Sequence, residues 1–249
     1  GMNRAVLDRK AIFWTPNREA RYKKFLMGLP SKICLYPLDE PAGATTVKDI
    51  WPNNLTLTVS GAIPGHRRFL KKSSVFFDGV NDRLGSADVV DNANCQVSAC
   101  TLFALVYSTD VTATKVIMAY ANSTVTAQGY SMARVGSKLR LEKFAPVGGT
   151  QVTDGTVNLL NNTWHLVAVT WDGTTGQTYL DGVASGTPFS DTEVPTWANT
   201  EELVIGARRD GVSYIVPYNG NQRWAGYCGV ALPVATLKEM TRLARTPRV

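Results

Sequence analysis

The clearest alternation of apolar and polar positions lies between residues 161 and 186, and it predicts three β-strands. Residues 164–171 are dense in β-branched and aromatic side chains, and both alternating faces are mostly apolar, which is typical of a central strand covered on both sides. Residues 177–180 form the predicted return strand. Asp181 and Gly182 follow it, and this pair predicts a two-residue hairpin turn of type I′.

Shorter runs of the same kind recur along the chain and are separated by turn residues. They predict strands at residues 33–38, 55–60, 75–77, 82–86, 99–107, 115–120, 130–135, 138–144, 203–206 and 224–230. Loops are predicted at residues 61–72, 187–200 and 207–223. In the strand at 138–144, Leu139 and Leu141 are expected to face inward and Glu142 to face water. Many short strands with regular turns indicate a β-sandwich.

Two segments have helical periodicity instead, and one lies near each end of the chain. Residues 17–29 carry apolar side chains at i, i+3, i+4 and i+7, namely Tyr22, Phe25, Leu26 and Leu29. Residues 233–245 form the second, short helix. The first helix has two open interpretations. It packs on the sandwich, or it docks a partner chain or another copy of this one.

A family resemblance rests on motifs that occur in the same order. Residues 164–173 read W-H-L-V-A-V-T-W-D-G, and Y-L-D-G follows at 179–182. The other motifs are L-Y-P-L-D-E at 35–40, V-F-F-D-G-V-N-D-R-L at 75–84, L-V-I-G at 203–206 and the strand at 224–230. Together they resemble the laminin-G-like, concanavalin-A-like lectin and glucanase family.

The resemblance implies an all-β fold, a two-sheet antiparallel jelly-roll sandwich. The N-terminal and C-terminal helices are short additions to it. We therefore expect an N-terminal helical extension at residues 1–32 and a laminin-G-like domain at 33–249, and Gly1 ahead of Met2 indicates a residue left by tag cleavage. The motif at 75–84 resembles a hairpin of the family. Lectins, adhesion modules, pentraxins and glycosidases all share this fold, so the motifs indicate the fold more strongly than the function.

Composition and charge remove several classes of function. The chain has 249 residues, a net charge of +6 and a pI of about 9.2, but no run of Lys and Arg interleaved with aromatic residues, so no nucleic-acid partner is expected. No apolar stretch reaches the 18 residues or so that a membrane span needs. We see no signal peptide, because charged residues interrupt the first apolar run. The resemblance favours an extracellular, cell-surface or virion-associated protein.

The four cysteines do not have the spacing of a zinc site. Cys34 lies in the predicted opening strand and Cys228 in the closing strand, which the resemblance makes neighbours. A disulfide between them and two buried free thiols both remain open, and so does a pairing of Cys95 with Cys100.

Acidic residues do not form the pattern that glycoside hydrolysis requires. A retaining glycosidase needs two carboxyl groups about 5–5.5 Å apart, as strand positions i and i+2 provide. Glu201 and Glu202 are adjacent and would point to opposite faces, and Glu142 stands alone among basic residues. His165 matches the strand histidine of the family, which is structural in most members. We therefore predict no catalytic residue.

Calcium is the metal that sandwiches of this type often hold, through oxygen ligands. The candidate ligands are Asp39, Asp78, Asn81 and Asp82. Asp78 is explained by the turn that it forms with Gly79, and Asp39 by hydrogen bonding at a strand end. We assign no metal or cofactor, and a structural calcium stays open.

A glycan site needs polar groups beside aromatic rings at an exposed rim. The predicted loop at 207–223 offers that mixture. The candidate ligand-binding residues are Arg208, Asp210, Tyr214, Tyr218, Asn219, Asn221, Gln222 and, from another loop, Trp197. The function that the resemblance implies is non-catalytic recognition of a glycan or glycoconjugate. The alternatives are a structural or adhesion module of a larger assembly, such as a phage particle or surface complex, and a divergent glycoside hydrolase.

Overall fold

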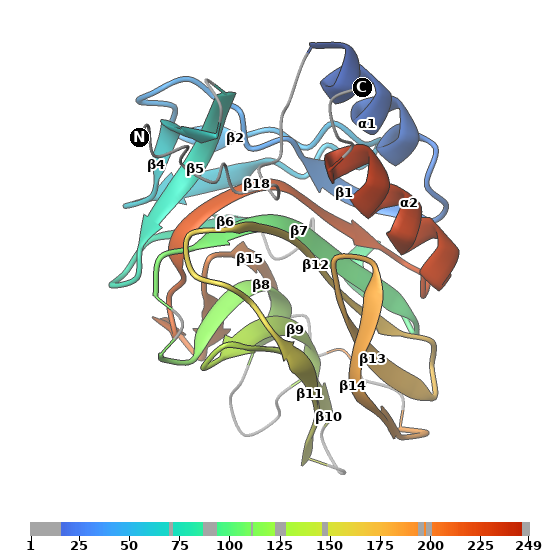
Figure 1. Cartoon of the computed structure of the whole chain (residues 1–249). Helices are drawn as coiled ribbons and strands as arrows, with labels where there is room; N and C mark the ends of the chain where they lie inside the picture. Colours follow the sequence, from blue (N-terminus) through green and yellow to red (C-terminus); the bar gives the residue numbers. More distant parts are fainter. Residues whose placement is uncertain are drawn as a thin grey trace, which may run out of the picture.

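Two antiparallel β-sheets pack face to face, and two helices cover the outside of one of them (Figure 1). The computed structural model of the chain describes residues 16–69, 72–86, 94–110, 112–122, 128–145, 149–193, 197 and 201–245. The eight-stranded sheet, which lies under the helices, is called the helix-side sheet, and the ten-stranded one the far sheet. This architecture confirms the predicted two-sheet sandwich.

The helix-side sheet has the strand order β14-β13-β12-β7-β18-β5-β4, and β1 also pairs with β18. Its strands are β1 (Lys32–Tyr36), β4 (Ile63–Phe69), β5 (Lys72–Asp78), β7 (Cys100–Ser108), β12 (Trp164–Trp171), β13 (Thr175–Leu180), β14 (Val183–Ser190) and β18 (Asn219–Cys228).

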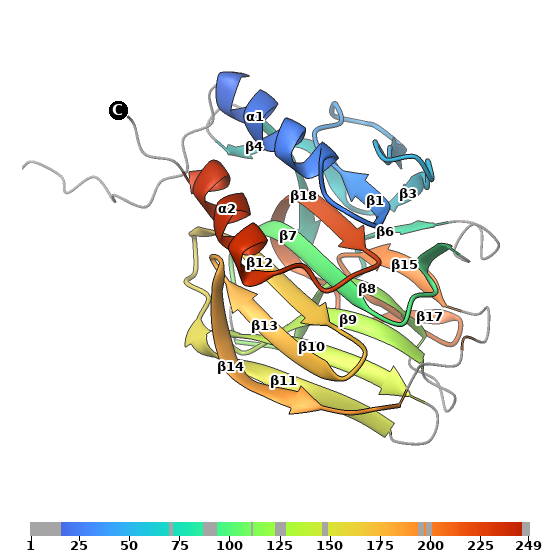
Figure 2. The ribbon, with the colours of Figure 1, turned by 90° about the vertical axis from the view of Figure 1, so that its right-hand side faces the viewer.

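The far sheet has the order β11-β10-β9-β8-β15-β6-β3-β2, and the hairpin of β16 and β17 joins it beside β8. Its strands are β2 (Thr46–Val47), β3 (Leu57–Ser60), β6 (Arg83–Ser86), β8 (Lys115–Asn122), β9 (Gln128–Val135), β10 (Lys138–Ala145), β11 (Gly149–Asn158), β15 (Glu202–Ile205), β16 (Arg208–Asp210) and β17 (Ser213–Ile215). At one edge of the sandwich, β11 lies beside β14 of the other sheet (Figure 2).

Strand β12 shows how alternation builds two cores. Val167, Val169 and Trp171 point into the core between the sheets. Trp164 and Leu166 point to the opposite side, into a second core beneath the helices. Every residue of β12 is buried, so the prediction of a central strand covered on both sides is confirmed.

The sequence motif at residues 164–182 is held together by a hydrogen bond between His165 and Asp181. The backbone N–H of Leu160 donates to Nε2 of His165 at 3.1 Å, so Nδ1 carries the hydrogen and donates to Asp181 at 2.8 Å. Asp181 also accepts the N–H of Leu166 at 3.0 Å. Asp181 and Gly182 have φ values of 55° and 77°, which confirms the predicted type I′ turn. His165 and Asp181 thus fix the β13–β14 hairpin against β12.

Both helices pack on the outer face of the helix-side sheet and contact each other (Figures 1 and 2). Helix α1 spans Pro16–Met27 and buries Tyr22 and Leu26 completely, and α2 spans Val234–Arg245 and buries Leu237 and Met240. These four side chains join Trp164 and Trp224 in the second core. The interpretation that the first helix packs on the sandwich is confirmed.

Three predicted loops contain strands. Strand β4 lies within residues 61–72, β14 extends into 187–200, and β16, β17 and the start of β18 lie within 207–223. The polar stretch before residue 158, for which no strand was predicted, forms β11. Most of these strands lie at sheet edges or in an added hairpin, where one side faces water and the apolar alternation is weak.

The motif at residues 75–84 is not a hairpin. Strand β5 before the turn belongs to the helix-side sheet, and β6 after it belongs to the far sheet. Oδ2 of Asp82 accepts the N–H of Asp78 at 2.7 Å, and Oδ1 of Asp78 accepts the N–H of Val80 at 2.7 Å. Asp78 and Asp82 therefore shape the crossing between the two sheets.

All four cysteines are free, buried thiols. Cys34 belongs to the core between the sheets, whereas Cys228 belongs to the core beneath the helices. The two side chains point to opposite faces of the helix-side sheet, so the open question of a disulfide between them is answered in favour of free thiols. Cys95 and Cys100 are likewise unpaired.

Candidate functional site

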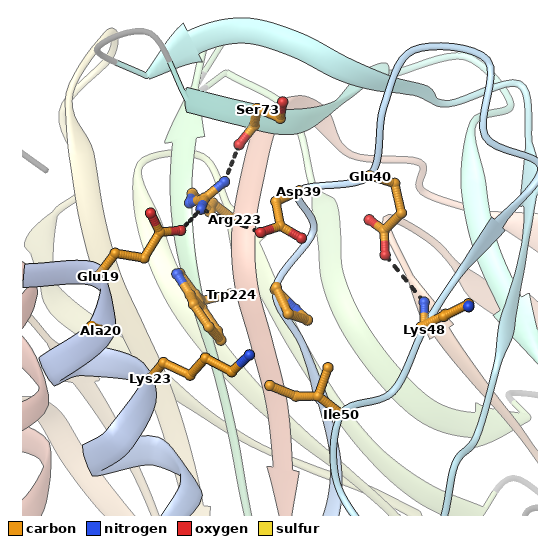
Figure 3. A pocket seen from close by; sticks show the side chains of 11 residues that line it. Glu19, Ala20, Lys23, Asp39, Glu40, Lys48, Ile50, Ser73, Arg223 and Trp224 are labelled. Carbon is orange, nitrogen blue, oxygen red and sulfur yellow. Dashed lines mark hydrogen bonds and ion pairs between the residues drawn. The ribbon is translucent and has the colours of Figure 1, made fainter. Parts of the chain in front are cut away.

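A polar pocket of about 610 Å³ lies where α1 meets the outer face of the helix-side sheet (Figure 3). We call it the α1 pocket. It is lined by Glu19, Ala20, Lys23, Pro37, Asp39, Glu40, Lys48, Ile50, Ser73, Arg223 and Trp224. These residues come from α1, from the segment that follows β1, from β5 and from β18, so segments far apart in the sequence meet here.

A β-bulge in β18 gives the pocket its two central side chains. The register of β18 against β7 shifts between Arg223 and Ala225, and Trp224 has a φ of 55°. Neighbouring residues of a regular strand point to opposite faces, but a bulge lets two successive side chains share one face. Arg223 and Trp224 therefore both point out of the sheet toward α1. A left-handed backbone at a bulky residue costs of order 1–3 kcal/mol, which the surrounding contacts must offset.

Arg223 is 1% exposed and connects three segments. Its guanidinium donates to the carboxylate of Glu19 on α1 and to the backbone carbonyl of Ser73 on β5. The carboxylate of Asp39 lies 3.8 Å from it. Figure 3 shows the guanidinium between these three groups, with the indole of Trp224 beside it. A buried cation with such partners fixes the wall of the pocket and the position of α1 together.

The open side of the pocket carries both signs of charge. Lys23, Asp39 and Lys48 are exposed, and Oε1 of Glu40 accepts the backbone N–H of Lys48 at 3.1 Å. Burial is the main cause that raises the pKa of Glu40 above its ordinary value. Lys23 extends from α1 along Trp224 toward Ile50 (Figure 3). The pocket thus offers hydrogen-bond donors and acceptors above an apolar floor.

Three buried polar atoms at the pocket have no hydrogen-bond partner within the described part of the chain. They are Nε1 of Trp224, Nε of Arg223 and Oε2 of Glu40. A buried donor or acceptor without a partner costs about 1–3 kcal/mol. Such groups are typical of binding sites, where a ligand or water completes the hydrogen bonding. The arrangement is suited to holding a polar molecule.

Three of the predicted site residues are buried, and the expectation that they stand on an exposed rim is wrong. Tyr218, Asn221 and Gln222 are completely buried. The hydroxyl of Tyr218 is 2.9 Å from that of Ser108, and Nε2 of Gln222 donates to the carbonyl of Ile117 at 3.0 Å. Asn221 and Gln222 are buried because β18 begins at Asn219 and lies between β5 and β7, and Tyr218 directly precedes this strand. Glycine and amide residues in this strand conceal its alternation.

Two other predicted residues lie on the β16–β17 hairpin, over the outer face of the far sheet. Arg208 forms an ion pair with Glu142, and its guanidinium carbon lies 4.7 Å from the ring centroid of Phe144. Glu142 is only 8% exposed for this reason, so the expectation that it faces water is wrong. The hydroxyl of Tyr214 donates to Glu202 at 2.7 Å.

The remaining predicted residues are scattered. Asp210 is half-buried at the tip of the same hairpin. Asn219 accepts a hydrogen bond from Thr109 at 2.5 Å. The ring of Trp197 packs 5.4 Å from that of Tyr120, against the core between the sheets. The structure therefore does not bring the predicted set together, and none of its members lines the α1 pocket.

The calcium candidates are spread over two places. Asp39 lies at the α1 pocket, while Asp78 and Asp82 shape the crossing from β5 to β6 together with Asn81 in the turn. Within the described ranges, no group of three His, Cys, Asp or Glu side chains is close enough to hold a metal ion.

A model of the concanavalin A-like lectin/glucanases superfamily, of the laminin G type, matches residues 81–226. This match covers more than half of the chain, and the chain belongs to that superfamily. No curated protein matches the sequence. Neither helix in the described part of the chain is long and apolar enough to cross a membrane.

Solved structures share the fold at low sequence identity. CBM40 of the Ruminococcus gnavus IT-sialidase, bound to α2,3-sialyllactose, has a TM-score of 0.56 at 11% identity, over 67% of this chain and 96% of its own. The binding domain of botulinum neurotoxin DC, in complex with SialylT, has a TM-score of 0.61 at 10% identity, over 87% of this chain and 52% of its own.

A third structure shares a larger part of this chain. A Trypanosoma rangeli sialidase mutant displaying trans-sialidase activity has a TM-score of 0.62 at 11% identity, over 94% of this chain and 38% of its own. This chain therefore spans about half of the neurotoxin domain and a smaller part of the sialidase. Likeness at this identity shows a lectin-like fold and leaves the ligand of this chain to the chemistry of its own surface.

Proposed function

We propose that this protein is a non-catalytic carbohydrate-binding module that holds a glycan in the α1 pocket. The observation that carries the proposal is the lining of the pocket. Three cationic and three anionic side chains surround a floor that includes Ile50 and Trp224. A sugar presents hydroxyl groups, which both donate and accept, around a ring with apolar faces.

Size and charge support a neutral or zwitterionic glycan. A volume of about 610 Å³ lies within the range of roughly 300–1,000 Å³ that small-molecule sites occupy. Arg223 is engaged by Glu19 and lies near Asp39, so its charge is balanced within the protein. The charges at the open side of the pocket are those of Lys23, Lys48, Asp39 and Glu40, two of each sign. The structural neighbours named with sialyllactose and SialylT support glycan binding on this fold.

A glycan array with paired variants tests the proposal. Lys23→Ala and Glu40→Gln remove charges from the pocket, whereas Lys24→Ala removes an exposed charge from the next position of α1, outside the pocket. We expect the wild-type protein and Lys24→Ala to bind the same glycans. Lys23→Ala and Glu40→Gln should each bind them at least tenfold more weakly. Binding that all four proteins share equally, or no binding at all, would contradict the proposal.

One observation favours the alternative of an assembly module. An apolar groove of about 520 Å³ runs between α1 and α2, lined partly by Phe25, Leu29 and Leu243. We infer that a second copy of the chain would fill this groove, which corresponds to the alternative interpretation of the first helix as a docking element. Deleting residues 2–32 would unfold the second core, because Tyr22 and Leu26 belong to it. Light scattering of Arg21→Glu, which reverses a charge at the groove, tests the idea instead, and a wild-type monomer contradicts it.

A further inference from the structure

A second hollow lies on the opposite side of the sandwich, at the outer face of the far sheet. It has a volume of about 200 Å³ and is lined by Thr58, Ser60, Arg83, Gly85, Glu202 and Tyr214. Leu57, Leu84 and Leu203 point into the core between the sheets, so the alternate residues on β3, β6 and β15 point outward. Tyr214 reaches over them from β17. We call this hollow the Tyr214 pocket.

Glu202 supplies the main acceptor of this pocket. It is 6% exposed, and its Oε2 accepts the hydroxyl hydrogen of Tyr214 at 2.7 Å. Its Oε1 makes no hydrogen bond within the residues described. A Cβ added to Gly85 would lie 2.5 Å from that Oε1, so glycine at this position leaves the room that the carboxylate occupies. One carboxylate oxygen is thus held in place, and the other remains available to a ligand.

Arg83 supplies the donors. The carbon at the centre of its guanidinium lies 3.7 Å from the ring centroid of Tyr214, so the planar group stacks on the ring and is held in position. Stacking uses the face of the guanidinium and leaves N–H groups at its edge available for hydrogen bonds. The hydroxyl groups of Thr58 and Ser60 lie on the neighbouring strand β3 and line the same hollow.

We propose that the Tyr214 pocket is a second binding site, which takes one ring of a neutral sugar or cyclic polyol. Two adjacent ligand hydroxyls would donate to the carboxylate of Glu202 and accept from Arg83. Glu202 opposes an anionic ligand, and Arg83 together with Arg209, 3.8 Å from Glu202, opposes a cationic one. The small volume admits a single ring. This site does not depend on the α1 pocket, and either one can fail alone.

The proposal implies a dependence on pH. Burial is the main cause that raises the pKa of Glu202 above its ordinary value. The charged and titratable groups that face it are Arg83 on β6, Arg209 on β16 and Tyr214 on β17. Protonation of the carboxyl group removes an acceptor, so affinity for the ligand should fall as the pH is lowered through the pKa of Glu202.

Nuclear magnetic resonance titration with D-glucose, D-galactose, D-mannose and N-acetyl-D-glucosamine at millimolar concentrations tests the site. At least one sugar should cause saturable shifts of the backbone amides of Thr58 and Gly85. Glu202→Gln keeps the shape of the side chain and should weaken that binding at least tenfold. Gly85→Ala keeps every charge but intrudes on the carboxylate, and it should weaken binding by a similar factor.

Two control variants, both outside the Tyr214 pocket, show whether a loss of binding is specific to this pocket. Glu142→Gln alters another buried carboxylate on the same face, outside the pocket, and it should leave the affinity unchanged. Lys23→Ala alters the α1 pocket alone and should also leave it unchanged. Shifts that are absent with all four sugars, or that Glu202→Gln and Gly85→Ala do not reduce, overturn the second site. If glycan binding is lost only with Lys23→Ala, the second site fails while the proposed function stands.

Discussion

The two outer faces of the sandwich differ in what covers them. The helix-side sheet lies beneath α1 and α2, and its outward positions join the helices in a core with aromatic members such as Tyr22, Trp164 and Trp224. Among the residues that the structure describes, the far sheet has a small outer cluster, made mostly of alanine and valine with Phe144. Its outward positions also hold ion pairs, for example Glu142 with Arg208. Strands with the same alternation therefore carry aromatic groups where helices cover them and charges where they do not.

The difference also explains the two hollows. On the helix-side sheet, the α1 pocket lies where the helical cover meets a bulged strand and the segment after β1. On the far sheet, the Tyr214 pocket lies where a short hairpin reaches over small outward residues. Each hollow therefore lies where the cover of its sheet ends. The following predictions test that contrast, from the largest expected effect to the smallest.

Leu26→Ala should have the largest effect, because Leu26 is completely buried beneath α1. Truncating a buried leucine removes apolar contacts and leaves a cavity, so we expect the free energy of unfolding to fall by about 3 kcal/mol. Urea denaturation measures this change. Lys24→Ala, at an exposed position of the same helix, should change it by less than about 0.5 kcal/mol. Equal losses in the two variants would show that α1 is not part of the core.

Glu19→Gln tests the ion pair that joins α1 to the bulged strand. Arg223 would lose its nearest carboxylate and keep Asp39 at 3.8 Å. Because the guanidinium is buried, we expect a loss of about 2 kcal/mol in the free energy of unfolding. The double variant Glu19→Gln, Arg223→Met should recover part of the loss in the same denaturation experiment. A double variant less stable than Glu19→Gln would contradict this explanation.

Glu142→Gln is the matching change on the uncovered face. The side chains of Arg208 and Glu142 are 14% and 10% exposed, and the helices do not depend on this pair. We expect a loss of about 1 kcal/mol, again measured by urea denaturation. If Glu142→Gln proves more destabilising than Glu19→Gln, the contrast between the two faces is wrong.

The smallest effect concerns pH. Burial raises the pKa of Glu202 in the folded protein, so the folded state binds this proton more tightly than the unfolded state does. Between the ordinary pKa of a glutamate and the raised pKa, stability should therefore fall as the pH rises. Comparing the pH dependence of unfolding for the wild type and Glu202→Gln isolates this contribution. The wild type should lose more stability over that range, and parallel curves would contradict the prediction.

Much of the fold could be predicted from the sequence because its strongest patterns come from buried central strands. Residues 164–171 are apolar on both faces, and Asp181-Gly182 has the residues that its turn requires. The edge strands β4 and β11 escaped prediction because water replaces apolar neighbours on one side of each. Alternation of apolar and polar residues is strong only where a strand face is buried, and β4 and β11 bury too little of their side chains to produce it.

The α1 pocket could not be predicted, for a different reason. Its central feature is a bulge in β18, which places Arg223 and Trp224 on one face, and an alternation rule assigns them to opposite faces. The pocket also combines α1 with residues more than two hundred positions later in the chain, as the ion pair of Glu19 with Arg223 shows. Tyr214 was identified from the mixture of polar and aromatic residues around it, but its partners Arg83 and Glu202 lie on other strands.

Free thiols lie both in the core between the sheets and in the core beneath the helices, so thiol modification can follow the opening of each core separately. Cys228 is buried under the helices, where burial raises its pKa to about 12, whereas Cys34, Cys95 and Cys100 are enclosed in the core between the sheets. A thiol-modifying reagent reacts with the thiolate, so each cysteine becomes modified only when its surroundings open. Dissociation of the two helices from the helix-side sheet would expose Cys228 first. Separation of the sheets would expose the other three, so the order of modification would reveal which layer opens first.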